Sequence, residues 1–508
     1  MIFLGIELGS TRIKGVLTDE KAKVLAQGAY EWENKFIDGI WTYSFDEIKS
    51  GLRACYSSLK EDYKSKTGGN ITEINAIGVS AMMHGFIALD SRNKPLAPFK
   101  TWRCGDAEKE ANQLTKLFNF PIPARWTAAH LYKAVKDKAS YLAEINTVTT
   151  LAGYVHSLLS GKHVLGVGDA SGVFPVSGGN YDLKLLEKFN KQLNGKLSKS
   201  VYELFPKVLL AGQCAGYLTA NGAKLLDKDG DLQSGALMCP PEGDAGTGMV
   251  ATNSVKPLTG NVSAGTSVFS MAVLEKPLTA VYDGVDVVTT PTGSPVVMVH
   301  CNNCSSEINA WVQLFSEACG VDKNKLYTKL FNLSLEGEED CGGVVACNYN
   351  SGENITGITS GTPFVAHTAE SNFTLANFIR AQLYSAFATL KLGNDSFFKK
   401  EKIKIEKYYA HGGLFKTEGV CQQYLAAALN TPVAVMTTAG EGGAWGMAIL
   451  AAYAADNELP LEQYLESKVF AKSKLKIVTP AVETVKGFNL YTKNFKKAIK
   501  AEKVFYKV

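Results

Sequence analysis

An isolated acid stands in a run of small residues near the middle of this 508-residue chain, where Asp244 lies within "PEGDAGTGMV". Its neighbours Gly243, Ala245 and Gly246 leave room for a ligand to approach the carboxylate. A carboxylate that reaches a substrate hydroxyl at about 3 Å acts as a general base. In such turns an acid is also commonly an Asx turn or a helix cap. The pattern makes Asp244 a candidate general base, with a local structural role as the alternative.

The N-terminal stretch "FLGIELGSTRIKGVLTDE" combines residue types that bind phosphate and metal ions. Apolar residues alternate on both sides of a Gly-Ser-Thr turn, which is typical of two short strands joined by a tight bend, and Gly9 permits that bend. The turn would bring backbone N–H groups, the hydroxyls of Ser10 and Thr11 and the ammonium of Lys14 together, as phosphate sites do. Glu7 ends the first strand, where its carboxylate is a candidate metal ligand. An ordinary N-terminal hairpin is the alternative.

A second hairpin of the same kind begins about halfway along the chain. In "NVSAGTSVFSMAVLE" an apolar segment leads into Gly265 and Thr266, and another apolar segment follows. One hydroxyl hairpin in each half predicts a duplicated domain with a phosphate site between the copies, since ligands favour domain interfaces. Because the match is only a few residues long, coincidence between two short turns stays open as the alternative.

Near the C-terminus, "YYAHGGLFKTEGVCQQYLAAALNTPVAV" has the pattern of a strand, a glycine turn and a helix. The strand is expected within residues 403–410, the turn at Gly412 and Gly413, and the helix over residues 420–429. Such a turn lets a phosphate or a planar ligand approach the backbone closely at the start of a helix. Paired glycines are common in turns, so nucleotide contact needs the support of the other motifs.

The bulk composition narrows the class of protein. Hydrophobic residues make up 46% and charged residues 20% of the chain, as in ordinary globular proteins. Strand-like runs alternate with helical patterns, which predicts α/β architecture in two to four domains of about 150 residues each. The net charge of +4 does not indicate nucleic-acid binding, and the basic C-terminal run fits the solvated face of a last helix. No apolar stretch reaches the ~20 residues that span a bilayer.

The ten cysteines show no disulfide-like spacing. Cys301 and Cys304 have the spacing of zinc ligands, but no second such pair follows, so buried or free thiols are expected. The first residues lack a secretion signal, because Glu7 interrupts the apolar run. Reduced thiols without such a signal predict a cytoplasmic protein.

Six segments, in this order along nearly the whole chain, resemble the FGGY family of carbohydrate kinases. They are "GIELGSTRIKGVL", "GVSAMMHGFIALD", "GDASGVFPV", "GDAGTG" with "SAGTS", "NYNSGENITG" and the stretch from "HGGLFKTEG" to "GGAWGMAILAAY". The resemblance implies an α/β fold of two duplicated ribonuclease H-like domains, of the actin/hexokinase-like ATPase kind, with a cleft between them. The domains are expected at residues 1–250 and 251–508.

The resemblance also implies a role for each matched residue. Asp244 matches the catalytic aspartate that accepts the proton of the attacking sugar hydroxyl, and it is expected to contact sugar and metal as well. Glu7 stands where most members have the aspartate associated with Mg²⁺, so the longer side chain makes a water-bridged or shifted metal the alternative to direct ligation. The expected ATP ligands are Ser10, Thr11, Lys14, Gly265, Thr266, Gly412 and Gly413. The expected sugar ligands are Met83, His84 and Trp102.

The substrate implied by the resemblance is a small sugar, and Met83-His84-Gly85 favours D-xylulose. The family's Trp-x-Asp-x-Arg pattern is altered here, because Cys104 replaces the aspartate and Asp106 the arginine. Xylulokinases often carry glutamine at the position of Met82. Together these differences leave L-ribulose open as the substrate, and glycerol or gluconate are less favoured alternatives. Trp126 is a candidate for stacking on a sugar, with core packing as the alternative.

The predicted function is therefore ATP- and Mg²⁺-dependent phosphorylation of a ketopentose. A non-catalytic sugar sensor is a second hypothesis, which rests on glutamate at position 7. A nucleotide-dependent binding protein of the actin kind is a third, and Asp244 and His84 argue against it. The expected partners are the sugar and ATP, without nucleic acid or membrane, and a homodimer is considered because family members are often dimers.

Overall fold

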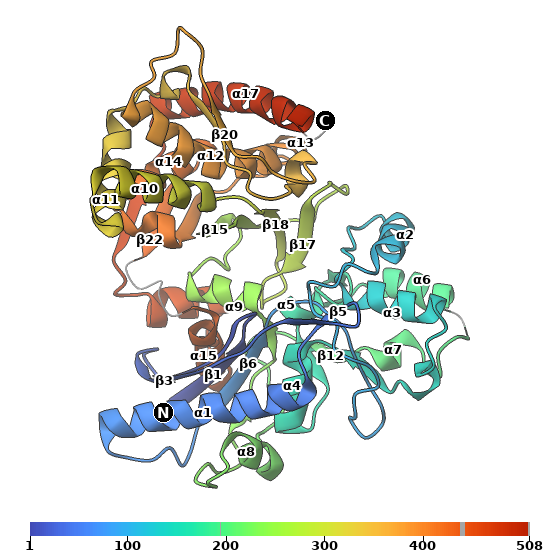
Figure 1. The fold of residues 1–508 in the computed structure, drawn as a ribbon. Coiled ribbons are helices and arrows are strands. Elements are labelled where there is room, and N and C mark those ends of the chain that lie inside the picture. The colour runs from blue at the N-terminus through green and yellow to red at the C-terminus, as the bar shows by residue number, and fades with distance from the viewer. Residues whose placement is uncertain (194, 437–441, 506–508) are drawn as a thin grey trace. The chain divides into compact units, whose positions relative to one another are not determined.

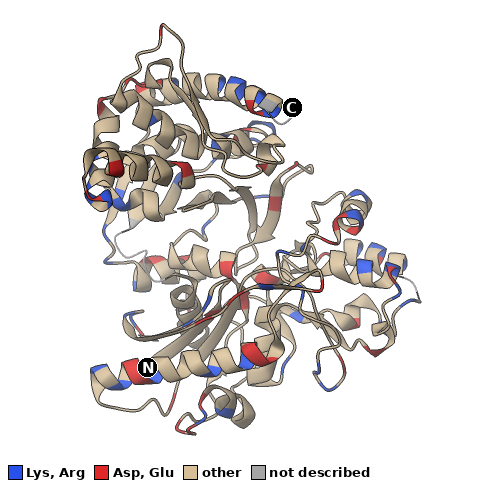
Figure 2. Ribbon diagram, in the orientation of Figure 1, with Lys and Arg blue, Asp and Glu red and all other residues tan. Residues whose placement is uncertain are grey.

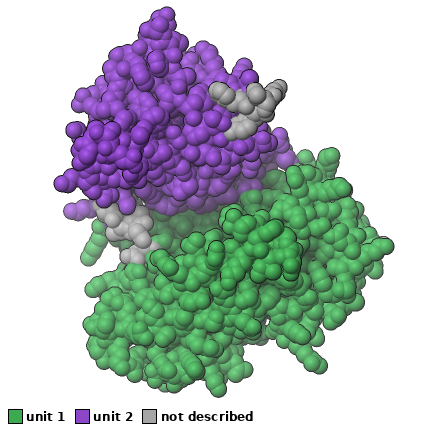
Figure 3. Space-filling model, viewed as in Figure 1, with its two compact units in different colours: residues 1–255, 287–296, 440–472 green, residues 256–286, 297–439, 473–508 purple. Residues whose placement is uncertain are grey.

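The computed structural model describes residues 1–193, 195–436 and 442–505. The chain forms two compact units (Figures 1 and 3): unit 1 comprises residues 1–255, 287–296 and 440–472, and unit 2 comprises residues 256–286, 297–439 and 473–508. Unit 1 includes two segments from the second half of the chain, so the two compact units do not correspond to two consecutive halves of the sequence. The division of the sequence at residue 250 stays a prediction.

Unit 1 is built on a sheet in the order β13-β6-β1-β2-β3, with β14 also paired to β6. The strands are β1 Ile2–Leu8, β2 Arg12–Asp19, β3 Val24–Glu31, β6 Ala76–Ala81, β13 Leu237–Met238 and β14 Glu242–Gly243. β1, β2 and β3 pair antiparallel, whereas β6 runs parallel to β1, and β13 and β14 run parallel to β6. The predicted N-terminal hairpin is thereby confirmed.

A seven-stranded sheet, most of which belongs to unit 2, has the order β17-β18-β16-β15-β21-β22-β23. Its strands are β15 Thr259–Ala264, β16 Val268–Val273, β17 Val285–Thr289, β18 Pro295–Cys301, β21 Lys407–His411, β22 Val433–Met436 and β23 Leu475–Val478. β15 and β16 form the second predicted hairpin, and β15, β21 and β22 run parallel. The series β2-β1-β6-β13 in unit 1 therefore recurs as β16-β15-β21-β22, which confirms the duplicated actin/hexokinase-like fold.

The helices of unit 1 begin and end with local signals that the sequence carries. α1 (Phe45–Thr67) packs on β2 and β3, starts where Ser44 accepts the N–H of Glu47, and ends at Gly68 with φ 74°. The other helices of unit 1 are α2 Glu108–Phe118, α3 Thr127–Lys136, α4 Leu151–Ser160, α5 Val167–Ala170, α6 Leu183–Leu193, α7 Val201–Leu204, α8 Ala220–Leu226, α9 Asp244–Ala251, α15 Gly442–Ala455 and α16 Leu461–Tyr464.

The helices of unit 2 include two that the sequence predicts. They are α10 Ser306–Cys319, α11 Lys323–Leu333, α12 Leu375–Asp395, α13 Phe398–Glu401, α14 Val420–Leu429 and α17 Val482–Phe505. α14 has the predicted bounds, and α17 contains the basic C-terminal run. The strand expected within residues 403–410 is shorter than predicted, because β21 begins only at Lys407.

The basic C-terminal run lies on the water-facing side of α17, as predicted (Figure 2). Its exposed lysines are Lys493, Lys496, Lys497, Lys500 and Lys503. Phe488, Tyr491 and Phe495 form the opposite, buried face. Residues on each face recur every three to four positions, as in an amphipathic helix. The lysines therefore form the solvent-exposed face of α17 and need no binding partner to explain them.

α15, the most apolar helix, is an internal element of unit 1. It packs against β1, β6 and α9, and all its residues from Gly443 to Tyr453 are buried. Glycines permit these close contacts, because a Cβ on Gly5 would lie 2.0 Å from the carbonyl oxygen of Ala444, and a Cβ on Gly446 would lie 2.1 Å from that of Thr247. Within the described ranges, no helix combines the length and the apolar character that crossing a bilayer requires.

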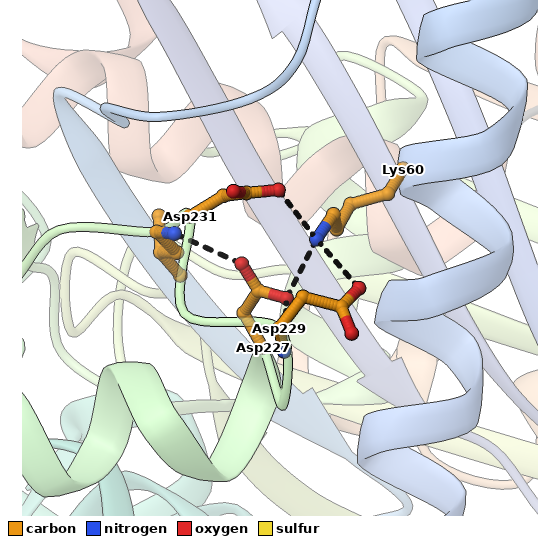
Figure 4. Close-up of polar contacts among 5 residues, drawn as sticks. Lys60, Asp227, Asp229 and Asp231 are labelled. Carbon is orange, nitrogen blue, oxygen red and sulfur yellow. Dashed lines mark hydrogen bonds and ion pairs between the residues drawn. The ribbon is translucent and has the colours of Figure 1, made fainter.

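One lysine ties α1 to the loop that follows α8 (Figure 4). The ammonium of Lys60 lies 2.7 Å from Asp227, 3.1 Å from Asp229 and 3.0 Å from Asp231. Burial raises the pKa of Asp227, but the hydrogen bond from Lys60 and the N–H of Leu232 outweigh burial, so the pKa lies below its ordinary value. The cluster therefore stabilises the folded state above pH 4 or so, and this contribution is lost as the pH falls through the lowered pKa.

We predict that Lys60→Met lowers the free energy of unfolding by about 3 kcal/mol, because it leaves the buried Asp227 carboxylate without its cation. Lys66→Met is the matched control on the same helix. Its pair with Asp62 is solvent-exposed, so it should cost less than about 1 kcal/mol. Urea denaturation at pH 7 measures both. Equal effects of the two substitutions at pH 7 would show that the cluster contributes nothing special.

Candidate active site

The predicted site residues of unit 1 gather where parallel strands end. β1, β6 and β14 run in one direction, with Glu7 and Glu242 both opposite Ser80. The segments that follow these strands are therefore brought to one edge of the sheet. They are the Gly-Ser-Thr turn at residues 9–11, the Met83–His84 pair and Asp244. The sequence assigned these three segments to a site separately, and strand pairing places them together.

Asp244 is the first residue of α9, and Gly243 precedes it as the N-cap. The backbone N–H of Met83 donates to Oδ1 of Asp244 at 3.2 Å, so the acid is bonded to the predicted sugar pair. Desolvation by the surrounding protein raises the pKa of Asp244 to about 6, while the N–H groups of Met83 and Ala245 lower it. Because the side chain is open to solvent, water screening moves this pKa toward the ordinary value of 3.8. The carboxylate is thus ionised at neutral pH.

Glu7 lies opposite Lys14 in the first hairpin and against the start of α15. A Cβ on Gly443 would lie 2.2 Å from Oε1 of Glu7, so only a bare backbone at position 443 accommodates the longer acid. Burial and the charge of Asp244 raise the pKa of Glu7 to about 7, while the N–H of Ala444 and the charge of Lys14 lower it. The repulsion from Asp244 shows that the two carboxylates share one environment.

Two facing carboxylates are a donor set that suits Mg²⁺, which proteins commonly hold through one or two carboxylates together with substrate phosphates. Among the described residues, no group of three or more His, Cys, Asp or Glu side chains is arranged to hold a metal ion by itself. Glu7 and Asp244 therefore fit a shared ion and do not form a complete protein cage. Cys301 and Cys304 are buried free thiols, as predicted.

His84 is buried at 6% exposure in a left-handed backbone conformation, with φ 72°. Burial, together with the nearby charge of Arg125, keeps the pKa of His84 well below its ordinary value, so the ring is neutral. Its Nδ1 lies against the backbone of Gly172, where a Cβ would lie 2.7 Å away, and the backbone of Gly172 partly offsets the lowering of the pKa. The ring lies parallel to that of Trp126 with centroids 6.2 Å apart. Trp126 is fully buried, so it is a core residue, and its ring packs against that of His84.

Trp102, a predicted sugar ligand, is bonded to the first turn: its Nε1 donates to Oγ of Ser10 at 3.3 Å. The ring is 42% exposed and available to a ligand. The two departures from the family pattern hold this segment in place. Cys104 is buried against the carbonyl oxygen of Trp41, and Asp106 pairs with Lys100 at 2.6 Å.

The predicted site residues of unit 2 also lie at one edge of their sheet. Ser263 of β15 is opposite His411 of the parallel β21, so the turns that follow these two strands are neighbours. Gly412 has φ 116°, and a Cβ there would lie 2.2 Å from the carbonyl oxygen of Ala264. Only glycine fits at this position, since both the conformation and the contact exclude a side chain. Gly265, Thr266, Gly412 and Gly413 therefore form a second group of predicted ligands.

Sequence reasoning missed two buried acids beside Asp244. Glu242 accepts the N–H groups of Gly168 at 3.3 Å and Asp169 at 3.0 Å. Burial and the charge of Asp169 raise the pKa of Glu242 to about 8. Burial also raises the pKa of Asp169 to about 7, the Thr150 hydroxyl lowers it, and Asp244 raises it further. An acid two residues before Asp244 was the available signal.

The strand order, repeated in the two units, defines a fold of the actin/hexokinase-like class. Models of the N-terminal and C-terminal domains of the FGGY family of carbohydrate kinases match residues 2–229 and 260–455. The chain belongs to this family, as the resemblance of its motifs predicted. It is therefore a carbohydrate kinase, and ATP is the phosphate donor of that family.

Individual relatives match most or all of the chain at low identity. A xylulose kinase from Haemophilus influenzae is 25% identical over 481 residues, which cover 87% of this chain and 91% of that protein. A xylulose kinase structure from Rhodospirillum rubrum has a TM-score of 0.80 at 17% identity, with both chains fully covered. A gluconate kinase structure from Lactobacillus acidophilus has a TM-score of 0.78 at 18% identity, with 99% of each chain covered. The fold is thus compatible with more than one sugar.

We predict that the stability of the protein falls as the pH rises from about 5 to about 8, because the folded state binds protons on Glu242 and Asp169 that the unfolded state releases. Glu242→Gln should flatten this decline, since glutamine does not titrate. Thermal unfolding between pH 5 and pH 9 measures the slope. The control is Glu187→Gln on the exposed face of α6, which should keep the wild-type slope. Parallel curves for wild type and Glu242→Gln would refute this assignment.

Proposed function

We propose that this kinase phosphorylates a ketopentose, with conversion of D-xylulose to D-xylulose 5-phosphate as the reaction best supported. One observation carries the proposal: the Met83 N–H bonds the carboxylate of Asp244, and the buried, neutral His84 follows directly. The acid and the Met-His pair that favours xylulose are thereby one constellation. The relatives named xylulose kinase support the same substrate.

In this proposal Asp244 is the general base. Its ionised carboxylate accepts the proton of the sugar hydroxyl while the hydroxyl oxygen attacks the γ-phosphorus of ATP. His84 and Trp102 hold the sugar, the neutral imidazole by a hydrogen bond to a hydroxyl and the indole by contact with its exposed ring. Phosphoryl transfer depends mainly on positioning and charge neutralisation, which fits a site without a covalent nucleophile.

The ATP ligands are proposed on both turns and on the glycine pair. Ser10, Thr11 and Lys14 supply hydroxyls and a cation to phosphate oxygens. The turn at Gly265 and Thr266 cradles the β- and γ-phosphates through the N–H of Thr266, because the N–H of Gly265 donates to the carbonyl oxygen of Ser267 at 2.9 Å. Gly412 and Gly413 offer bare backbone to the adenosine, because a Cβ on Gly413 would have no atom within 4 Å.

Mg²⁺ is proposed at Glu7 and Asp244, where the two carboxylates repel one another without a cation. When bound, the ion neutralises phosphate charge and so favours attack by the hydroxyl. The alternatives keep their sequence support. L-Ribulose remains a candidate because of Cys104 and Asp106, and a non-catalytic sensor because of Glu7. A cytoplasmic location and a homodimer are part of the proposal.

We predict that Asp244→Ala lowers kcat by roughly 10²–10⁴ with little change in ATP affinity, because a general base acts in the transition state. Asp244→Asn is the closer test, since its amide oxygen still accepts the Met83 N–H. For wild type, kcat/KM for the sugar should rise with pH through the Asp244 pKa, at or below about 6, and then level off. An unchanged kcat in both variants would remove Asp244 from the mechanism.

We predict that Glu7→Gln raises the Mg²⁺ concentration needed for half-maximal activity, because a neutral amide is a poorer ligand for this ion. Glu7→Asp keeps the charge and is the matched control, which should need far less extra Mg²⁺. Titration of activity with Mg²⁺ at saturating ATP and sugar measures both. If the Glu7→Gln titration coincides with that of wild type, Glu7 has no role at the metal.

The test of the proposed substrate is sugar-dependent ADP release with Mg·ATP. The sugars are D-xylulose, L-ribulose, D-ribulose, L-xylulose, glycerol and gluconate, and D-xylulose should give the highest kcat/KM. A higher value with another sugar would assign that substrate instead. No turnover with any of them, while ATP still binds, would favour the sensor.

A further inference from the structure

The second phosphate turn is attached to the loop that joins β18 to α10. The N–H of Cys304 donates to the carbonyl oxygen of Thr266 at 3.0 Å, and the N–H of Ser305 donates to that of Gly265 at 3.1 Å. In a trans peptide the C=O and the following N–H point in opposite directions. Holding these two carbonyls toward the loop therefore aims the N–H groups of Thr266 and Ser267 away from it. The loop thus sets the direction of the donors that the turn offers.

A buried carboxylate holds this loop in turn. Glu353 is 0% exposed, and its Oε2 accepts the N–H of Asn302 at 2.9 Å, the N–H of Asn303 at 3.3 Å and Nδ2 of Asn303 at 3.1 Å. Its Oε1 faces the N–H of Ile355 at 3.5 Å, on its own segment. One side chain thus accepts from the first two residues of the loop.

Asn303 adds hydrogen bonds between the loop and the segment that carries Glu353. Its Oδ1 accepts the N–H groups of Asn350 at 2.9 Å and Ser351 at 3.0 Å, and its own exposed fraction is 3%. Buried donors and acceptors that lose their partners are costly, so this network has one arrangement. Glu353 and Asn303 together connect segments about 50 residues apart to the turn at Gly265 and Thr266.

We propose that Glu353 is a positioning residue of the nucleotide site, which orients the phosphate-binding peptides of Gly265 and Thr266 through the loop at residues 301–305. The inference rests on the proposed function of that turn. Because Glu353 acts on peptides that face phosphate, its loss should weaken binding of the phosphates and spare the adenosine. A role in stability alone would lack this selectivity.

The test is Glu353→Gln in the full chain, with dissociation constants for ADP and for adenosine measured by calorimetry. Glutamine has nearly the same shape but is neutral, and when its oxygen accepts from Asn302 and Asn303 its N–H₂ group faces the N–H of Ile355, so one acceptor and the negative charge are lost. ADP binding should weaken about tenfold, adenosine binding less than about twofold, and KM for the sugar should stay unchanged. Equal weakening of ADP and adenosine, or no weakening, would overturn the inference.

Glu502→Gln is the matched control in the same unit. Glu502 is also buried, and it accepts the N–H of Thr362, outside the loop at residues 301–305, at 2.5 Å. It should change the melting temperature without changing the ratio of ADP to adenosine affinity. A shift of that ratio in Glu502→Gln as large as in Glu353→Gln would count against a specific role.

Two further variants separate the inference from the proposed function. Thr266→Pro removes the backbone N–H that the turn offers at residue 266, and unchanged ADP affinity there would remove the turn from the proposed nucleotide site. If Thr266→Pro weakens ADP binding and Glu353→Gln does not, only the inference fails. Should Glu353→Gln not fold, Asn303→Ala decides, because it removes the Nδ2 bond to Glu353 together with the two N–H bonds that Oδ1 accepts from Asn350 and Ser351. A selective loss of ADP affinity of about threefold would support the inference, and a non-selective loss or none would overturn it.

Discussion

The parallel pairing of β1 with β6 is the constraint on which the rest of unit 1 depends. It makes the end of the first strand a neighbour of the segment after Ala81, and β14 joins the same edge through β6. Residues more than 70 positions apart thereby meet around Asp244. Unit 2 repeats the arrangement with β15 and β21, which brings the turn at Gly265 beside Gly412. In both units, parallel pairing of strands brings the predicted ligands to one edge of the sheet.

Buried acidic side chains that accept backbone N–H groups recur next to these edges. Glu242 accepts from the start of α5, and Glu353 accepts from the loop beside the second turn. Removing a carboxyl group from water is costly unless aligned donors bond its oxygens. Such an acid therefore tolerates few arrangements of the backbone around it. This explains how short turns without much packing of their own keep a defined conformation.

Local patterns were sufficient for the elements that a few consecutive residues decide. The two hairpins, α14 and the basic face of α17 follow from alternation, glycine placement and helical spacing. The extra length expected for β21 was wrong, since Ile403 and Ile405 are apolar without pairing in the sheet. The burial of Glu242 and Glu353 could not be predicted from such patterns, because acidic residues are mostly exposed and their buried partners are distant in sequence.

By itself the sequence determined the residue types available for chemistry, the turns that carry them and the family to which their order points. These depend on side-chain chemistry and on backbone preferences within a few residues. Only the tertiary structure decided that Met83 bonds Asp244, that Glu7 rests on the bare backbone of Gly443, and that Trp126 is core. It also decided which carboxyl groups have raised pKa values. Burial and charge repulsion act through space, so they depend on segments that the fold, and not the chain, makes neighbours.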